Sequence, residues 1–238
     1  MTRRDPAGQP WTAAIRRLDA LSPLDNEALL ALARSAERPR AHRAKREIRA
    51  EGAEITETLI ILDGWAARQR VLEDGRRQIV DVLLPGDLIG ACDYERPLQS
   101  SSVLALTDVS TCVAPPAGIS PALGRAYALS RAWSEACLIA AVTRVGRMNA
   151  QERIADLLLE LLERLELSGT AENGRYSLPL TQELLGDTLG LTPVHVNRML
   201  QALRREGAIE LKGRDLVVHD PAALRRSIGR TEIRVTGA

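Results

Sequence analysis

Arg198 falls in the second turn of a predicted helix, where its side chain could read a base pair of DNA. The guanidinium offers two parallel N–H donors, which match the O6 and N7 acceptors of guanine. A lone arginine on a helix is more often only a solvated charge, so the interpretation depends on the surrounding sequence. The side chains expected to share its outward face are Val194, His195 and Asn197, and those expected to face inward are Val196, Met199, Leu200 and Leu203.

Residues 181–207 have the pattern of two helices joined by a tight turn, which would position Arg198 in this way. Gly190 can adopt the positive φ that ends a helix, Thr192 is a hydroxyl N-cap and Pro193 suits the first helical position. A glycine at position 207 would close the second helix. The stretch therefore predicts a helix-turn-helix, whose second helix enters the major groove of DNA.

Two further features surround this motif. Gly186 lies inside the first helix, where glycine is unfavourable, so we expect another helix to cross closely above it. The segment AIELKGRDLVVHD, residues 208–220, predicts a β-hairpin directly after the second helix. A helix-turn-helix followed by a hairpin is a winged helix. Lys212 and Arg214 at the hairpin tip would contact phosphates, and a merely solvated turn is the alternative.

The composition is that of an ordinary globular protein long enough for two domains. The chain has 238 residues, of which 45% are hydrophobic and 26% charged, and it contains no Phe. The net charge is +1, but the charges are unevenly distributed. From Leu191 to the end there are nine Lys and Arg but only five Asp and Glu. A basic C-terminal part favours a polyphosphate partner, although this imbalance alone is weak evidence.

Nothing in the sequence predicts secretion or a membrane anchor. Residues 1–10 have no apolar core, and we expect them to be disordered. No uninterrupted apolar run reaches the length of about 18 residues that spans a bilayer, so we expect a cytoplasmic protein without membrane contact. Cys92, Cys112 and Cys137 are scattered, which predicts buried thiols rather than a disulfide framework or a zinc site.

The first half of the chain changes from helical to strand patterns. Residues 11–20 and 25–36 predict short helices, with Asp25 as the cap of the second. Residues 46–113 contain short apolar runs between turn residues, including a hairpin signal at Asp74-Gly75. Short strands at near-regular spacing predict an N-terminal β-barrel or jelly roll, and the whole chain is expected to be α+β.

A helix of about 27 residues is predicted from Pro121 to Met148. It is too long and too apolar to stay exposed, so we expect burial against a second copy of the chain; packing on its own barrel is the alternative. Asn149 and Glu152 form a capping-box pattern that opens another helix, which makes residues 146–149 a hinge. The expected domains are a sensor at 1–118, a dimerisation helix at 119–148 and a DNA-binding winged helix at 149–238.

This order of parts resembles the Crp/Fnr superfamily of bacterial transcription regulators, named for the cyclic-AMP receptor protein and the fumarate–nitrate reduction regulator. The likeness covers roughly residues 25–220. It is carried by the turn LPGDLIG, which would belong to a cyclic-nucleotide-binding-like domain, by the helix start NAQERIADLLLEL and by LTPVHVNRMLQALRREGAI. The resemblance implies a homodimer that binds a palindromic site in double-stranded DNA and contacts RNA polymerase.

Within this family the guanine-reading arginine stands where Arg198 is found. The family has Glu at the position of Val194 and Ser or Gly at that of Asn197. A Glu would accept from cytosine N4, whereas a valine offers only methyl contact, so the half-site should keep its G but differ at the neighbouring pair. The expected DNA-contacting residues are Arg198, Asn197, His195, Val194, Thr192, Pro193, Thr181, Gln182, Lys212 and Arg214.

The resemblance also identifies where an effector would bind, and there the chain departs from the pattern. Cyclic-nucleotide binders have Gly-Glu after the Pro-Gly-Asp turn and a later Arg-Ser; here Gly90-Ala91 and Gln99-Ser100 take these places. Cyclic AMP is therefore disfavoured. An iron–sulfur cluster is disfavoured because no Cys precedes Cys92. Haem is disfavoured because the sequence has no His between His42 and His195 that could bind the iron, although Cys92 or Cys112 could still serve as the ligand.

The leading interpretation is a homodimeric DNA-binding regulator without classical cyclic-AMP binding, whose signal is unknown, and three alternatives to it remain. The barrel could bind another small molecule through Gln99, Ser100, Ser101, Arg76 and Arg77, in which case the protein is a sensor whose effector gates DNA binding. The cysteines could instead sense redox state. An enzyme is the weakest interpretation, because the chain has no Gly-rich phosphate loop, no G-x-S-x-G and no H-E-x-x-H motif. No cofactor is expected.

Overall fold

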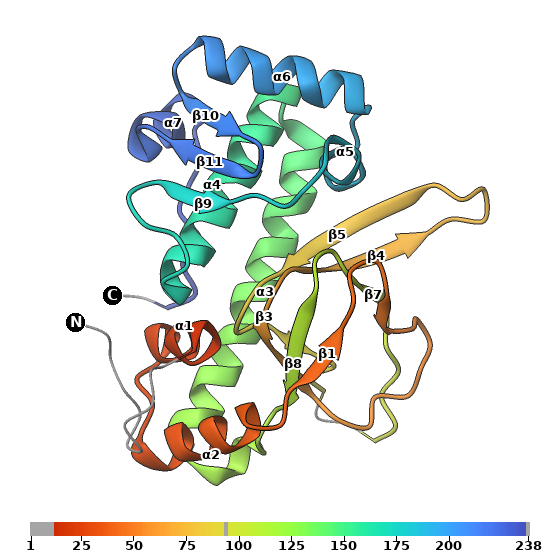
Figure 1. The fold of residues 1–238 in the computed structure, drawn as a ribbon, viewed down its shortest axis with the longest axis vertical. Helices are drawn as coiled ribbons and strands as arrows, with labels where there is room; N and C mark the ends of the chain where they lie inside the picture. The colour runs from red at the N-terminus through yellow and green to blue at the C-terminus, as the bar shows by residue number, and fades with distance from the viewer. Residues whose placement is uncertain (1–11, 93–94, 237–238) are drawn as a thin grey trace. The chain divides into compact units, whose positions relative to one another are not determined.

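The computed structural model describes residues 12–92 and 95–236, so the expected disorder of residues 1–10 lies outside the described part (Figure 1). The chain packs as two compact units, and the division falls inside the long helix. The domain bounds derived from the sequence stay predictions. Within the described residues, the first unit comprises 12–69, 82–92, 95–134 and 167–169, and the second comprises 70–81, 135–166 and 170–236.

Two four-stranded antiparallel sheets form the N-terminal β structure, with strand orders β1-β8-β3-β6 and β2-β7-β4-β5. This is the predicted jelly roll. No strand pairing among the described residues joins the two sheets into a closed barrel. The strands are β1 Arg40–His42, β2 Glu47–Arg49, β3 Leu59–Asp63, β4 Ala66–Val71, β5 Arg77–Leu83, β6 Leu88–Ile89, β7 Ser102–Ala105 and β8 Val109–Val113.

Alternation along the strands divides the first unit's core into two layers. On β3, Leu59 and Ile61 join a cluster with residues of both sheets, such as Val103, whereas Ile60 belongs to a second cluster. Successive side chains of a strand point to opposite faces, which explains the division. The second cluster is completed by the helices α1 Ala13–Leu21 and α2 Asn26–Ala36 and by the start of the long helix.

The local signals of turns and caps agree with the structure. Asp25 caps α2, its Oδ1 accepting from the amide of Ala28 at 2.9 Å. The hairpin predicted at Asp74-Gly75 joins β4 and β5, with Gly75 at φ +84°. The strand region starts earlier than expected, because β1 consists of Arg-Ala-His and has no apolar run that could reveal it.

The long helix α3 spans Pro121–Arg147, in agreement with the predicted 27 residues, and follows a short 3-10 turn, η1 Ala117–Ile119. The first turns of α3 follow the alternative named above, packing within the same chain. Leu123 and Tyr127 are buried against α1 and α2 of the same chain, not left for a second copy. The large apolar side chains that α3 leaves exposed are Ile139 (62%) and Val142 (74%).

The second unit contains the C-terminal elements. Helix α4, Ala150–Ser168, starts with the predicted capping box: Asn149 Oδ1 accepts from the amide of Glu152 at 3.1 Å, and Glu152 Oε2 accepts from the amide of Asn149 at 2.8 Å. None of the described helices combines the length and apolar composition needed to cross a membrane. The remaining elements are β9 Arg175–Ser177, α5 Gln182–Leu189, α6 Pro193–Arg205, β10 Ile209–Lys212, β11 Asp215–Val218 and α7 Pro221–Ser227.

Candidate nucleic-acid interface

The helix-turn-helix forms as the sequence predicts. Thr181 caps α5, which ends at Gly190 with φ +66°. Thr192 caps α6, its Oγ1 accepting from the amide of His195 at 3.3 Å, and Pro193 is the first helical residue. These caps satisfy amides that have no partner within a helix, so the turn is defined by local chemistry.

Glycine is needed at position 186 for a different reason from the one expected. A Cβ at this position would lie 2.5 Å from the carbonyl oxygen of Leu191. The amide of Leu191 also donates to the Gly186 carbonyl at 3.1 Å. The close neighbour is therefore the backbone of the turn itself and not a crossing helix. Glycine allows α5 and the turn to touch, which fixes where α6 begins.

Helix α6 divides cleanly into a buried and an exposed face. Val196, Leu200 and Leu203 are buried, as predicted. The side chain of Arg198 is exposed and makes none of the hydrogen bonds or ion pairs found between described side chains, which leaves its donors available to a partner. The other predicted outward residues are also exposed, namely Val194 (72%), His195 and Asn197.

One contact links the exposed faces of the two helices. Asn197 Nδ2 donates to Gln182 Oε1 across 3.4 Å. The orientation of both amides is assigned from this contact, since oxygen and nitrogen exchange places on a flip. Two of the residues expected at the interface therefore lie together across the α5–α6 turn.

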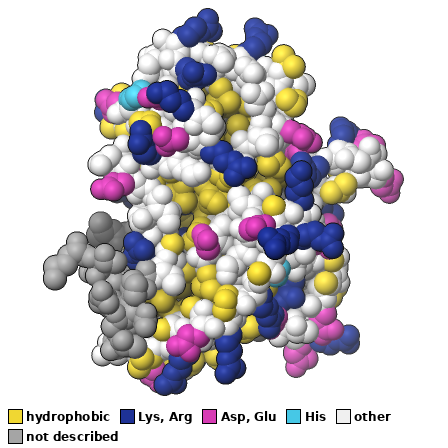
Figure 2. Space-filling model, viewed as in Figure 1, with side chains coloured by type: hydrophobic (Ala, Val, Ile, Leu, Met, Phe, Trp, Pro, Cys, Tyr) yellow, Lys and Arg dark blue, Asp and Glu magenta, His cyan; other side chains and the backbone are white. Residues whose placement is uncertain are grey.

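The hairpin β10–β11 follows α6 and pairs with β9 through β11, which gives the predicted wing. Its tip is a two-residue turn of Gly213 and Arg214, with Gly213 at φ +60°. Lys212 is not an isolated charge, because its Nζ pairs with the carboxylate of Glu210 and thereby lowers the pKa of Glu210. Arg214 is exposed, so it is the more available cation at the tip. Figure 2 shows further Lys and Arg side chains along the edge of the molecule where Figure 1 places α6.

Only two of the five residues predicted to bind an effector lie in the same pocket. A pocket of about 300 Å³ in the first unit is lined by Gln99 and Ser100, but its lining does not include Ser101, Arg76 or Arg77. Arg76 pairs with Asp74 on its own hairpin, and Arg77 pairs with a residue of α5. Besides Gln99 and Ser100, the pocket is lined by Ile55, Arg68, Leu88, Gly90, Ala91, Cys92, Leu98, Ser130, Arg131 and Ser134.

Comparison with known proteins identifies the family. Residues 152–227 match the model of the Crp-like helix-turn-helix domain, and residues 39–123 match that of the cyclic nucleotide-binding domain. The transcriptional activator protein FnrL of Cereibacter sphaeroides is 30% identical over 200 residues, which cover 80% of this chain and 80% of that protein. The chain belongs to the Crp/Fnr family. It is therefore a transcription regulator with a DNA-binding helix-turn-helix.

Other members of the Crp/Fnr family are similar to the same extent. The nitrogen fixation regulation protein FixK of Azorhizobium caulinodans is 33% identical over 178 residues, covering 70% of this chain and 69% of that protein. The structure of FixK2 from Bradyrhizobium japonicum superposes with a TM-score of 0.68 at 28% identity, covering 79% of this chain and 96% of that one. The recognition helix and the wing both lie inside the matched DNA-binding segment.

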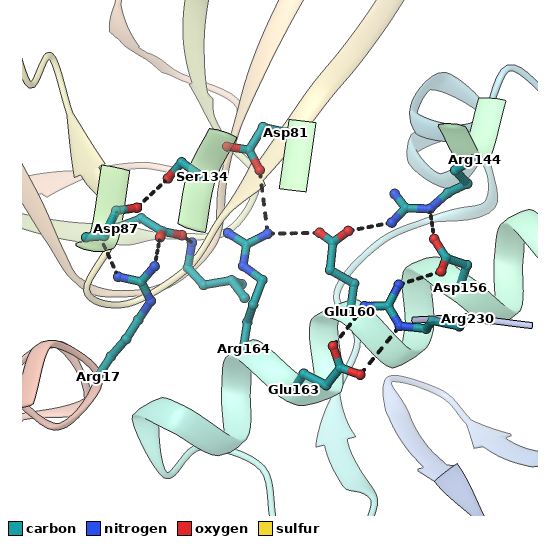
Figure 3. A network of polar contacts seen from close by, with 12 residues as sticks. Arg17, Asp81, Asp87, Ser134, Arg144, Asp156, Glu160, Glu163, Arg164 and Arg230 are labelled. Carbon is teal, nitrogen blue, oxygen red and sulfur yellow. Dashed lines mark hydrogen bonds and ion pairs between the residues drawn. The ribbon is translucent and has the colours of Figure 1, made fainter. Parts of the chain in front are cut away.

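Arg17, a residue that holds parts of this Crp/Fnr fold together, was not predicted from the sequence. Arg17 on α1 is 1% exposed and donates from Nη1 to the carbonyl of Gly86 at 2.8 Å and to Ser130 Oγ at 3.0 Å. Its Nη2 pairs with Asp87 Oδ1 at 2.7 Å (Figure 3). Arg17 thus clamps the Pro-Gly-Asp turn to α3. In the sequence it reads as one more polar residue of an amphipathic helix, so no local signal could have revealed it.

Proposed function

We propose that two copies of the chain bind a two-fold symmetric DNA site, each reading one half with Arg198. The observation that carries this proposal is the exposed, unengaged guanidinium in the second turn of α6. A helix in this position of a helix-turn-helix presents its first turns to base edges in the major groove, and Arg pairs there with guanine. Asn197, held beside Gln182, adds a second polar group next to the arginine. Thr181 and Thr192, as helix caps, stand where backbone amides approach phosphates.

The long helix supplies the surface for the second copy. Ile139 and Val142 are exposed on α3 although both are apolar, and burying them against a twin helix would remove that surface from water. A symmetric dimer would set the two copies of α6 one helical turn apart, about 34 Å. The DNA-bound dimer would then act on RNA polymerase.

Val194 would change which base pair follows the guanine. Its side chain is 72% exposed on the outward face, so it can reach the groove. A valine cannot accept a hydrogen bond from cytosine, but its methyl groups can contact the methyl group of thymine. We therefore propose a half-site that differs from the family consensus at this pair.

Cyclic AMP does not fit the pocket of the first unit. The described residues that line the pocket include no carboxylate, and Ala91 stands where the family's ribose-binding Glu is expected. At the phosphate position, Gln99 Oε1 is buried and has no hydrogen-bond partner among the described residues, in the amide orientation assigned here. A cyclic phosphate would therefore meet a neutral amide in place of the family's Arg and would lose the charge-assisted hydrogen bonds that a guanidinium supplies.

The same unsatisfied oxygen favours a second candidate function, a sensor of another small molecule. A buried acceptor without a partner is costly, and a ligand that carries an N–H or O–H donor would satisfy it. The pocket of about 300 Å³ has the volume of a small ligand site. A rise in melting temperature with an added compound, lost in Gln99→Ala, would support this function.

Selection of bound DNA from a random pool tests the leading proposal. The wild-type protein, without added ligand, should recover a two-fold symmetric site, and Arg198→Ala should lose it. Arg204→Ala is the matched control, because it removes the same charge from the exposed end of α6 and should weaken binding without changing the sequence recovered. Identical sites from the wild type and Arg198→Ala would refute the role of Arg198.

A further inference from the structure

A continuous chain of buried ion pairs runs through the second unit. Four arginines alternate with four carboxylates, so the charges balance. Figure 3 labels all of them except Arg225. The order of contact is Asp81, Arg164, Glu160, Arg144, Asp156, Arg230, Glu163 and Arg225. All but Glu163 and Arg225 have side chains that are at most 5% exposed. None of these eight side chains is among the residues proposed to contact DNA.

Arg144 makes the connection between the long helix and α4. It lies in the last turn of α3, and its Nε donates to Asp156 Oδ2 at 2.6 Å while its Nη2 pairs with Glu160. The two carboxylates are four residues apart on α4, so they lie on one face of that helix. One rigid guanidinium therefore grips two points of α4, which fixes the angle at the joint predicted to be a hinge.

Arg230 completes this grip from the C-terminal segment. Its Nη1 pairs with Asp156 Oδ1, the oxygen that Arg144 does not use, and its Nη2 binds Glu163 Oε2 at 2.8 Å. Arg230 lies beyond α7 and outside the matched DNA-binding segment, which ends at residue 227. Asp156 is thus shared between the last turn of the long helix and the segment that follows α7.

The sharing makes the contacts interdependent. A buried carboxylate that loses one of its partners carries a large free-energy penalty, because its charge is then left without a compensating group. Without Arg230, one oxygen of Asp156 and one of Glu163 would lose their partner. Three carboxylates on one face of α4 would then share the three remaining arginines, namely Arg144, Arg164 and Arg225. The guanidinium of Arg144 would then have to redistribute between unpaired carboxylates. Its direction, and with it the direction of α4, would no longer be unique.

We propose that Arg230 is a positioning residue for DNA reading, which fixes the α3–α4 joint through Asp156 and so sets the separation of the two recognition helices. This inference rests on the proposed symmetric dimer. Arg230 touches no DNA in this scheme. It acts by allowing only one arrangement of each DNA-binding unit on its dimer helix, and therefore one spacing of half-sites.

The test compares three duplexes carrying the selected symmetric site, one with the original spacing and two with a base pair added or removed at the centre. Full-length wild-type protein should prefer the original spacing strongly. Arg230→Gln should lower this preference by about tenfold, the size of an ordinary coupling between sites. Its affinity for an isolated half-site should not change. A merely structural role would lower all affinities together and leave the ratio intact.

Arg225→Gln is the matched control, because Arg225 pairs with Glu163 but does not reach Asp156 in the described contacts. It should keep the wild-type spacing preference. If Arg230→Gln does not fold, Arg230→Lys keeps the charge without the fork and should show the same loss. An Arg230 variant with an unchanged ratio, or an Arg225 variant with an equal loss, overturns the role of Arg230 alone. A wild-type protein that recovers no symmetric site refutes the proposed dimeric reading instead.

Discussion

Arg77 on strand β5 donates from Nε to Oδ2 of Asp187 on helix α5 across 2.8 Å, and its Nη2 reaches the same oxygen. The next residue, Gln78, donates from Nε2 to the carbonyl of Thr188 at 3.2 Å. Residues 70–81 therefore pack as part of the second unit, although β5 also pairs in a sheet with β4. Arg77, expected from the sequence to bind an effector, instead holds the first helix of the DNA-reading motif.

The Arg77–Asp187 pair should contribute measurably to stability. Both side chains are about one quarter exposed, so solvent screens the pair in part, and we expect a coupling of about 1 kcal/mol in the free energy of unfolding. The measurement is a double-mutant cycle of Arg77→Ala and Asp187→Ala by urea denaturation. The local pair of Arg76 with Asp74, which is far more exposed, is the control and should show a coupling near zero. Equal couplings for both pairs would contradict this prediction.

Gly186→Ala should disrupt the helix-turn-helix. The added methyl group would lie 2.5 Å from a backbone oxygen that cannot move without displacing the turn, so we expect a loss of about 2 kcal/mol and weaker specific DNA binding. Gly146→Ala is the control: it is also helical, but nothing lies within 4 Å of its Cβ, and Ala should stabilise it by up to about 1 kcal/mol. Urea denaturation and binding to the selected site measure both effects. A Gly186→Ala protein as stable as Gly146→Ala would refute the close approach.

Features that depend on neighbouring residues could be predicted from the sequence, whereas contacts between residues far apart in the sequence could not. Gly190, Thr192 and Pro193 act on backbone groups within four residues of themselves, so their types reveal the turn. The apolar spacing of α6 reveals its buried face. Arg17 and Arg230 find their partners 69 to 113 and 67 to 74 residues away, respectively. No periodicity or local motif encodes such a contact. The fold and the DNA-reading face were therefore predictable, whereas the buried clamps required the three-dimensional structure.

Arg17→Met should destabilise the first unit strongly. It would leave the buried carboxylate of Asp87 without its guanidinium and the Gly86 carbonyl without its donor, which costs about 3–5 kcal/mol for a pair at 1% exposure. Arg43→Met is the control, because its pair with Asp108 is 3.4 Å long and largely exposed, and it should change stability by less than about 1 kcal/mol. Thermal and urea unfolding of both variants decide the question. Similar losses for the two variants would show that the clamp contributes little.

Stability should decline at alkaline pH in a way that depends on Cys112. Burial raises the pKa of this thiol from 9.0 to about 11. A folded-state pKa above the unfolded value means that the stabilisation is complete below pH 9 and is lost as the pH rises from 9 towards 11. The difference in free energy of unfolding between wild type and Cys112→Ala should therefore shrink from pH 8.5 to 10.5, measured by urea denaturation. A constant difference would show that the thiol titrates normally in the fold.

Cys92 should be the thiol that reacts in the native protein. It is half-buried and lines the pocket, whereas Cys112 and Cys137 are buried. Only an accessible thiolate attacks an alkylating reagent or an oxidant at an appreciable rate. Iodoacetamide should label Cys92 in the folded chain and the other two only in urea, as mapped by mass spectrometry. An oxidant that changes DNA affinity should then act on wild type and Cys112→Ser but not on Cys92→Ser. Native labelling of Cys112, or an oxidant effect that survives Cys92→Ser, would exclude Cys92 as the redox-sensitive residue.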